Sequence, residues 1–304
     1  MREVDLPAPL GVAVSGGPDS LALLLLAAAR HPGQVRAATV DHGLRRGSAE
    51  EAAAVAEICR ARGIPHDILT VSVRGSLQAA ARAARYRALA DWAVANRLPF
   101  LATAHHADDQ AETLLMRLAR GAGVGGLAGA RRQRPLAPGV TLVRPLLGHR
   151  KAELEALVAA AGLTPVHDPS NRDPRFDRTA ARQLLAATPA LDPARLARSA
   201  ANLAEAEEAL AWTVDRLAAE RIAGDALDPA GLPPELVRRL VARLFAAHGA
   251  TPSGPELSRL IARLEAGQAA TLAGLKALPG PRWRFVPAPP RRRPSDRGAR
   301  AIVP

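Results

Sequence analysis

Cysteine is almost absent from this chain of 304 residues, with Cys59 its only example. One thiol cannot build a disulfide framework, a zinc cluster or an iron–sulfur site. The first residues lack the basic-then-apolar arrangement of a signal peptide, and the longest apolar stretch, residues 21–29, is too short to cross a bilayer. These absences predict a soluble, cytoplasmic protein without a cysteine-based metal site.

Aromatic residues and lysines are also scarce. The chain has three Trp, one Tyr and four Phe, so an extensive platform for stacking bases is not expected. Lys151 and Lys276 are the only lysines, yet the formal net charge is +12. A preference for Arg over Lys is typical of GC-rich coding sequences, but it does not explain the excess of basic over acidic residues. That excess favours a partner with a phosphate backbone.

Apolar runs and helical patterns alternate along the first half of the chain. Strands are expected at residues 10–14, 35–40, 67–73, 99–104 and 140–143, and helices at 20–29, 49–61, 76–96, 108–120 and 151–161. This alternation predicts an α/β fold with a parallel, Rossmann-like sheet and helices on both of its faces. Ligands of such sheets bind outside the carboxyl ends of the strands.

The length and the 48% hydrophobic content allow two domains. We expect an α/β domain over residues 1–188 and a smaller helical domain over residues 189–285, with helices at 193–219, 234–248 and 255–266. Residues 286–304 form a basic tail rich in Pro and Arg, which either contacts phosphate or is a disordered end. Charge and position suggest that the helical domain contacts nucleic acid.

A candidate phosphate loop, SGGPDS at residues 15–20, lies between the first strand and the first helix. Gly16 and Gly17, which precede Pro18, let the backbone approach a phosphate, and the dipole of the helix that begins near Ser20 attracts an anion. Ser15 and Ser20 add hydroxyl donors. Asp19 is unusual in an anion site and suggests a Mg²⁺ ligand or a group that positions a reactant. The alternative is a glycine turn with an ordinary helix cap.

Two further polar groups follow strands. Asp41 and His42 end the second strand, where they would lie beside a bound nucleotide unless they only form a turn. After the fourth strand, His105, Asp109 and Glu112 are spaced i, i+4, i+7, which places them on one face if that segment is helical. We expect this face to be functional. A solvated helix face is the alternative, and zinc binding is disfavoured because no His-Glu-x-x-His arrangement is present.

Several segments resemble known families. Residues 15–20 resemble the SGGxDS loop of the PP-loop ATP pyrophosphatases, and residues 105–113 resemble the HHxDDQxET motif of the tRNA(Ile)-lysidine synthases within that superfamily. Matching segments in the same order are residues 81–86 (ARxxRY), 120–129 (RGxGxxGLxG), 144–147 (RPLL), 168–171 (DPSN) and 178–182 (RNxxR). Thr179 stands where the last motif usually has Asn.

The resemblance implies a carbon–nitrogen ligase that uses ATP and Mg²⁺. Its substrates would be L-lysine and an isoleucine tRNA with a CAU anticodon. The C2 oxygen of cytidine 34 would attack the α-phosphate, pyrophosphate would leave, and the ε-amine of lysine would then displace AMP. The product, lysidine, would change the codon read from AUG to AUA.

The same resemblance suggests residue roles. Residues 15–20 would bind ATP together with Asp41 and His42, and Asp19 would hold Mg²⁺. Asp109 and Glu112 would bind the ε-amine and accept its proton, with His105 in support. Arg178 would contact the lysine carboxylate, a phosphate or the tRNA, and these three alternatives remain open.

Three other functions compete with this one. A cytidine 2-thiolase of the same superfamily generally needs cysteines for sulfur relay or a cluster, which a single Cys59 disfavours. An amidotransferase-type synthetase fits poorly with the basic charge and the lack of a glutaminase region. A non-catalytic RNA-binding protein on the same fold fits poorly with an intact loop and an intact acidic cluster.

Overall fold

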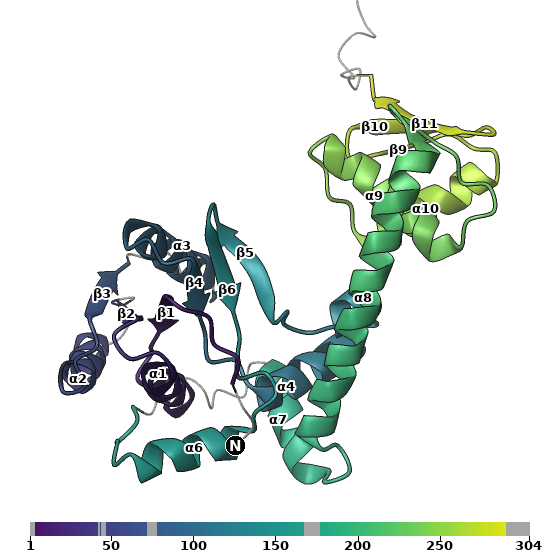
Figure 1. Cartoon of the computed structure of the whole chain (residues 1–304). Helices are drawn as coiled ribbons and strands as arrows, with labels where there is room; N and C mark the ends of the chain where they lie inside the picture. The colour runs from purple at the N-terminus through teal and green to yellow at the C-terminus, as the bar shows by residue number, and fades with distance from the viewer. Residues whose placement is uncertain (1–3, 42, 44–46, 72–77, 167–176, 290–304) are drawn as a thin grey trace, which may run out of the picture. The chain divides into compact units, whose positions relative to one another are not determined.

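The computed structural model describes residues 4–41, 43, 47–71, 78–166 and 177–289. The chain divides into two compact units, residues 1–207 and 208–304, whose elements are labelled in Figure 1. Each unit has its own hydrophobic core. The division falls within the long helix α8 (Pro193–Arg221). Most of the predicted basic tail, residues 290–304, lies outside the described residues.

The first unit contains a six-stranded sheet with the strand order β3-β2-β1-β4-β6-β5. Its strands are β1 (Leu10–Ala13), β2 (Val35–Asp41), β3 (His66–Thr70), β4 (Phe100–Ala102), β5 (Gln133–Ala137) and β6 (Val140–Val143). All neighbours pair in parallel except β5, which is antiparallel to β6 at the sheet edge. The predicted parallel sheet is thus confirmed, and β5 is an additional strand.

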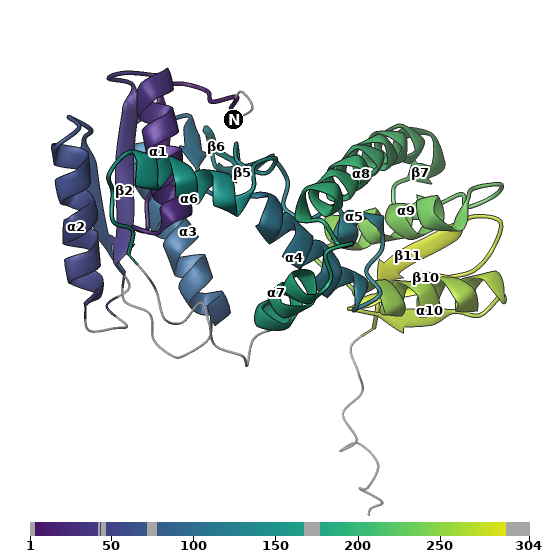
Figure 2. The ribbon, with the colours of Figure 1, turned by 90° about the horizontal axis from the view of Figure 1, so that it is seen from below.

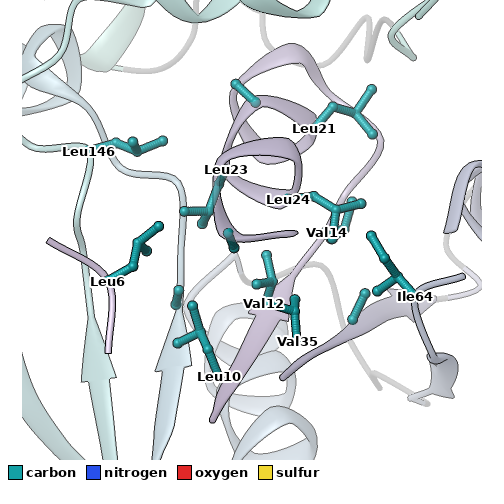
Figure 3. Packing of buried hydrophobic residues seen from close by; sticks show 14 of the residues in the cluster. Leu6, Leu10, Val12, Val14, Leu21, Leu23, Leu24, Val35, Ile64 and Leu146 are labelled. Carbon is teal, nitrogen blue, oxygen red and sulfur yellow. The ribbon is translucent and has the colours of Figure 1, made fainter. Parts of the chain in front are cut away.

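Helices cover both faces of this sheet, as predicted. The helices of this unit that precede α8 are α1 (Pro18–Arg30), α2 (Ser48–Arg60), α3 (Gln78–Ala95), α4 (Ala107–Leu118), α5 (Val124–Leu127), α6 (Lys151–Ala160) and α7 (Asp177–Ala187). Of these, α1, α2 and α3 contact the strands directly, and α6 packs against α1. Leu10 and Val12 of β1 belong to one hydrophobic cluster with residues of α1, α2 and α6. Figure 3 shows them beneath Leu23 and Leu24 of α1. On the other face, Gly11 lies against Trp92 of α3, where an added Cβ would be 2.8 Å from the indole ring. The alternation of side chains along β1 therefore supports two separate layers.

The strand order creates a switch point between β1 and β4. From β1 the chain runs outward through β2 and β3, and it then returns to the opposite side of β1 as β4. Because parallel strands end at the same edge, the connections after β1 and β4 emerge next to each other. The predicted phosphate loop and the predicted polar cluster occupy these two connections.

The second unit combines helices with a sheet. The predicted helices are present as the end of α8, α9 (Pro234–Ala247) and α10 (Gly254–Glu265). They are joined by a five-stranded antiparallel sheet that was not predicted from the sequence, in the order β7-β8-β11-β10-β9. Its strands are β7 (Ile222–Ala223), β8 (Ala226–Leu227), β9 (Ala270–Leu272), β10 (Leu275–Leu278) and β11 (Trp283–Pro287). None of the helices described is long and apolar enough to span a membrane.

Candidate active site

The loop after β1 is closed by hydrogen bonds to one hydroxyl group. Ser20 Oγ donates to the Gly17 carbonyl at 3.0 Å and accepts from the Ser15 amide at 3.1 Å. Ser15 Oγ lies 3.3 Å from the same hydroxyl. Helix α1 starts at Pro18, whose ring suits the first helical position because no amide donor is needed there. The loop is therefore held in one shape at the positive end of a helix dipole.

Gly16 is constrained by its backbone and by its neighbours. Its φ is +82°, in the left-handed region that favours glycine, and an added Cβ would lie 3.0 Å from Val166 Cγ2. The Val166 amide also donates to the Gly16 carbonyl at 2.9 Å. The chain after α6 thus passes directly beside the loop. The DPSN motif that follows, residues 168–171, lies outside the described residues.

His106 connects the loop to the polar cluster after β4. Its Nε2 lies 3.5 Å from Asp19 Oδ2 and 3.5 Å from Asp109 Oδ2. It also caps α4, because its Nδ1 accepts from the Asp109 amide at 3.4 Å while its own amide donates to Asp109 Oδ2 at 3.2 Å. Burial lowers the pKa of His106, but the hydrogen bond to Asp19 and the charges of Asp109, Asp19 and Asp108 outweigh burial and raise it above its usual value.

His106 was not among the functional residues predicted from the sequence. The side chain is only 4% exposed, and it is surrounded by carboxylates from two motifs. The sequence signal that could have indicated His106 is its position as the second of two adjacent histidines directly after a strand.

His105 does not lie on the helix, so its expected place on a helix face was wrong. Helix α4 begins at Ala107, and His105 belongs to the connection that precedes it. Its Nδ1 lies 3.1 Å from Thr103 Oγ1. Burial lowers the pKa of His105 to about 4, helped by the positive charge of Arg144 and opposed by Asp109. The imidazole is therefore neutral near neutral pH and is a weak proton acceptor.

Glu112 lies one turn beyond Asp109 on α4 and is held by α7. Its side chain is buried, with Oε1 2.6 Å from Arg182 Nε and Oε2 3.2 Å from Arg178 Nε. Figure 2 shows α7 alongside α4. Burial raises the pKa of Glu112, and the Arg182 hydrogen bond and charge oppose that rise. The structure thus brings the predicted Arg178 to the acidic cluster, together with Arg182, which was not predicted as a site residue. The i, i+4 spacing of the two arginines on α7 was the signal in the sequence that both side chains would lie on one helix face.

Asp108, the other acidic residue of the cluster, holds neighbouring segments together. Arg150 Nη2 donates to its Oδ1 at 3.2 Å, and the Lys151 amide donates to its Oδ2 at 2.8 Å. Arg150 Nη1 also contacts Asp192 Oδ2 at 3.3 Å, near the start of α8. Burial raises the pKa of Asp108, but these donors outweigh burial and lower it. Asp108 therefore fixes the start of α6 to the start of α4.

The glycine-rich segment after α4 is attached to that helix by two side chains. Gln110 is 4% exposed, and its amide group donates to the Ala130 carbonyl at 2.9 Å and accepts from the Ala130 amide at 2.7 Å. Arg117 donates to the carbonyls of Gly126 and Gly129. Gly129 has a φ of +69°, and an added Cβ would lie 2.5 Å from Gln110 Oε1. The backbone of the glycine-rich segment therefore lies directly against the side chain of Gln110 on α4.

Asp41 and His42 were expected beside the nucleotide. Asp41 ends β2, the neighbour of β1, so it lies at the same sheet edge as the loop. Its Oδ1 accepts from the Gly43 amide at 2.9 Å. His42 lies outside the described residues.

A Mg²⁺ ion fits the chemistry of Asp19. Its Oδ1 is buried and has no hydrogen-bond partner within the described part of the chain. A carboxylate oxygen next to a phosphate loop is a typical Mg²⁺ ligand, because Mg²⁺ binds through one or two carboxylates plus substrate phosphates. The described residues contain no group of three or more His, Cys, Asp or Glu side chains arranged to hold a metal.

Comparison with known proteins identifies the family to which this chain belongs. Residues 6–188 match the family model of a PP-loop domain. The chain is 52% identical over 299 residues to the tRNA(Ile)-lysidine synthase of Novosphingobium aromaticivorans, covering 94% of this chain and 90% of that protein. It is 46% identical to the enzyme of the same name from Zymomonas mobilis, with 95% and 91% covered.

The chain belongs to the tRNA(Ile)-lysidine synthase family. It is accordingly a carbon–nitrogen ligase with an ATP-using PP-loop domain. A solved structure, the U34-tRNA thiolase NcsA from Methanococcus maripaludis with its [4Fe-4S] cluster, shares the fold at 19% identity, with a TM-score of 0.53 over 64% of this chain and 71% of that one. In this member of the lysidine synthase family, Cys59 is buried, and burial raises its pKa to about 11. Its thiol is therefore poorly suited to sulfur transfer.

Proposed function

We propose that this chain joins L-lysine to C2 of cytidine 34 in an isoleucine tRNA with a CAU anticodon. The reaction consumes ATP, releases AMP and pyrophosphate, and changes the codon read from AUG to AUA. We place it in the cytoplasm and expect Mg²⁺ to assist. Membership of the tRNA(Ile)-lysidine synthase family supports the overall reaction, and the roles below rest on the geometry of the site.

The contact of His106 with both Asp19 and Asp109 carries the proposal. Asp19 belongs to the loop that would hold ATP, and Asp109 belongs to the face that would receive the amine. The two steps use one carbon of one base, so the nucleotide and the amine must be held close together. A buried imidazole between the two carboxylates gives the two half-sites a fixed separation.

The first step is the attack of the cytidine C2 oxygen on the α-phosphate of ATP, with loss of pyrophosphate. The backbone N–H groups of Gly16, Gly17, Asp19 and Ser20 and the dipole of α1 would stabilise the negative charge that develops. Asp19 Oδ1, with no partner of its own among the described residues, would hold Mg²⁺. When bound, Mg²⁺ would neutralise phosphate charge. Asp41 would contact the adenosine from the end of β2.

The second step is the attack of the ε-amine of lysine on C2, with loss of AMP. In solution this amine has a pKa of about 10.4, so it must lose a proton before attack. We propose that Asp109, at the start of α4, accepts that proton. Within the described part of the chain, its carboxylate contacts the amide and the imidazole of His106. His105, neutral and bonded to Thr103, would orient the substrate through a hydrogen bond.

Glu112 and Arg178 receive related roles. Two arginines engage Glu112, so its charge would hold them in place and add negative potential near the amine. The Arg178 side chain remains 45% exposed, and a guanidinium group has donors for a second anion. We propose that Arg178 contacts an anionic group of a substrate while it is anchored by Glu112.

We further propose that residues 1–188 carry out catalysis and that residues 189–285 contact the tRNA, with the tail, residues 286–304, in support. The net charge of +12 is the ground for the tRNA contact.

A partial reaction tests this function. With ATP, Mg²⁺ and the CAU tRNA but no lysine, pyrophosphate should be released in a single turnover and the adenylated tRNA should accumulate. Adding lysine should then release AMP. Release of pyrophosphate that is independent of the tRNA would contradict the proposed order of chemistry, and sulfur incorporation would favour the thiolase alternative.

A further inference from the structure

Four arginines surround Tyr86 in the first unit. The guanidinium carbons of Arg82, Arg134 and Arg85 lie 5.0, 5.2 and 6.0 Å from the centre of its ring, which is the range of cation–π contacts. Arg144 also interacts with Tyr86, whose side chain opposes the lowering of the Arg144 pKa by burial. We call these five residues the Tyr86 arginine cluster.

The cluster is assembled from three places in the fold. Arg82 and Arg85 come from α3, Arg134 comes from β5, and Arg144 directly follows β6. Arg82 is exposed, Arg85 and Arg134 are partly buried, and Arg144 is only 4% exposed. The positive charge therefore extends from the surface into the interior.

This charge is not neutralised within the described part of the chain, where none of the four arginines forms an ion pair with a carboxylate. Their contacts are the tyrosine ring, its hydroxyl and backbone oxygens, such as the Arg131 carbonyl at 2.6 Å from Arg144 Nη1. Arg144 Nε is buried without any hydrogen-bond partner among the described residues. Because arginines stay charged at neutral pH, such a cluster favours an anionic ligand.

The position of the cluster distinguishes it from the ATP loop. Strand β4 lies between β1, which carries the loop, and β6, which leads to Arg144. Neighbouring strands are about 4.8 Å apart, so the two places are separated by about 10 Å along the sheet edge. His105 follows β4 between them, and the charges of Arg144, Arg82 and Arg85 add to burial in lowering its pKa. The cluster therefore borders the side of the site away from the nucleotide.

We propose that the Tyr86 arginine cluster binds the phosphodiester groups that flank the reacting cytidine of the RNA strand. The inference rests on the proposed function, which places the reacting cytidine beside His105. When that base is bound there, the sugar–phosphate backbone attached to it must also lie at this edge of the sheet. Each phosphodiester carries one negative charge and matches the fork of a guanidinium group. The four positive charges of the cluster are more than the single carboxylate of lysine would neutralise. Their spread from the surface into the interior matches a row of successive phosphates.

Single and double alanine variants of the outer arginines test the proposal. Arg82→Ala and Arg134→Ala each remove one positive charge and leave the buried Arg144 side chain in place, so that no cavity is created in the interior. Arg87→Ala is the matched control, because Arg87 is an exposed arginine of α3 outside the cluster. Thermal unfolding checks that all variants remain folded.

Binding is measured with an RNA hairpin that carries a CAU anticodon loop, without ATP or lysine. Each cluster variant should bind about tenfold more weakly, the effect expected from removing one charge-assisted hydrogen bond. The slope of log affinity against log salt should fall by about 0.7 for each phosphate of the single strand that a variant no longer neutralises. Arg87→Ala should bind like the unchanged protein, and cluster variants that behave like Arg87→Ala would overturn the proposal.

Steady-state kinetics identify the source of the anion. The KM for tRNA should rise in the cluster variants while the KM values for lysine and ATP stay constant. A rise confined to lysine would assign the cluster to the lysine carboxylate, and a rise confined to ATP would assign it to nucleotide phosphates; either result would overturn the proposal. Lysidine formation by the unchanged protein is measured in parallel. Its absence would contradict the proposed function, whereas the hairpin comparison would still decide the role of the cluster.

Discussion

His106 Nε2 lies 3.5 Å from Asp19 Oδ2, and this contact joins the connection after β1 to the connection after β4. The two segments are more than 80 residues apart in the chain and meet because β4 returns to the side of β1 opposite β2. The geometry explains how a phosphate loop and an acidic face come to serve one site. It also makes Asp19 the first residue to substitute in a test of the proposed nucleotide chemistry.

Asp19→Asn should abolish nucleotide chemistry while tRNA binding stays intact. The amide keeps the shape of the side chain but removes the charge that would hold Mg²⁺. We expect pyrophosphate release to fall by at least about 100-fold, as when a charge-stabilising group is removed from an active site. Filter retention of tRNA should remain within about twofold of the unchanged protein, as for a substitution that leaves the fold intact. A collapse of retention would mean that Asp19 supports the fold instead.

Arg182→Met should destabilise the first unit, because Glu112 is buried and, among the residues that the structure describes, would keep only Arg178 as an ion-pair partner. Breaking a buried pair costs about 3–5 kcal/mol, and the partial exposure of Arg182 reduces our expectation to about 2 kcal/mol. Chemical denaturation measures this change. The control is Arg60→Met, which removes an exposed pair with Glu57 and should leave the unfolding midpoint unchanged. Equal effects of the two variants would refute a structural role for the Glu112 pairs.

Gly129→Ala and Gly139→Ala form a second matched comparison. Both glycines have positive φ, at +69° and +74°, but only an added Cβ at residue 129 meets a neighbour, Gln110. Gly139→Ala should cost about 1–2 kcal/mol of folding free energy from backbone strain alone. Gly129→Ala should cost about 2 kcal/mol more, because the two hydrogen bonds between Gln110 and Ala130 would be displaced. It should also lower kcat, since α4 carries Asp109.

The stability of the protein should fall as the pH is lowered, because of His105. Burial lowers its folded pKa to about 4, whereas the unfolded value is about 6.5. The unfolded state therefore binds one more proton between these values, and stability declines as the pH falls through this window. From pH 7 to about pH 5 the decline should be about 2 kcal/mol, and His105→Asn should remove it. An NMR titration of the imidazole with a midpoint near 6.5 in the folded protein would contradict this account.

The first unit was predicted well from the sequence because its signals are local. Buried strands appear as short apolar runs, and Gly16 and Gly17 stand directly before a helix of small and apolar residues. Asp109 and Glu112 were correctly placed on one helix, since a one-turn spacing needs no knowledge of the fold. His105 was misplaced because the capping box of His106 and Asp109 starts the helix at Ala107.

Features that depend on distant partners were not predictable in the same way. The role of Arg182 depends on α7 reaching α4, and the role of His106 depends on the strand order. The sheet of the second unit was missed because its strands are only two to five residues long. Strand β11 lies in a segment rich in Pro and Arg, where Trp283 and Phe285 alternate with exposed residues. Such short strands are stable only through pairing with one another.

The transfer of labelled lysine to tRNA is the decisive measurement of lysidine formation by this protein. The protein is incubated with ATP, Mg²⁺, labelled lysine and isoleucine tRNA bearing a CAU anticodon, and the modified nucleoside is identified after digestion. We expect one lysine per tRNA, attached at C2 of cytidine 34, and no label in a tRNA in which that cytidine is replaced by uridine. A protein that binds the tRNA and ATP but leaves the tRNA unlabelled would contradict this expectation.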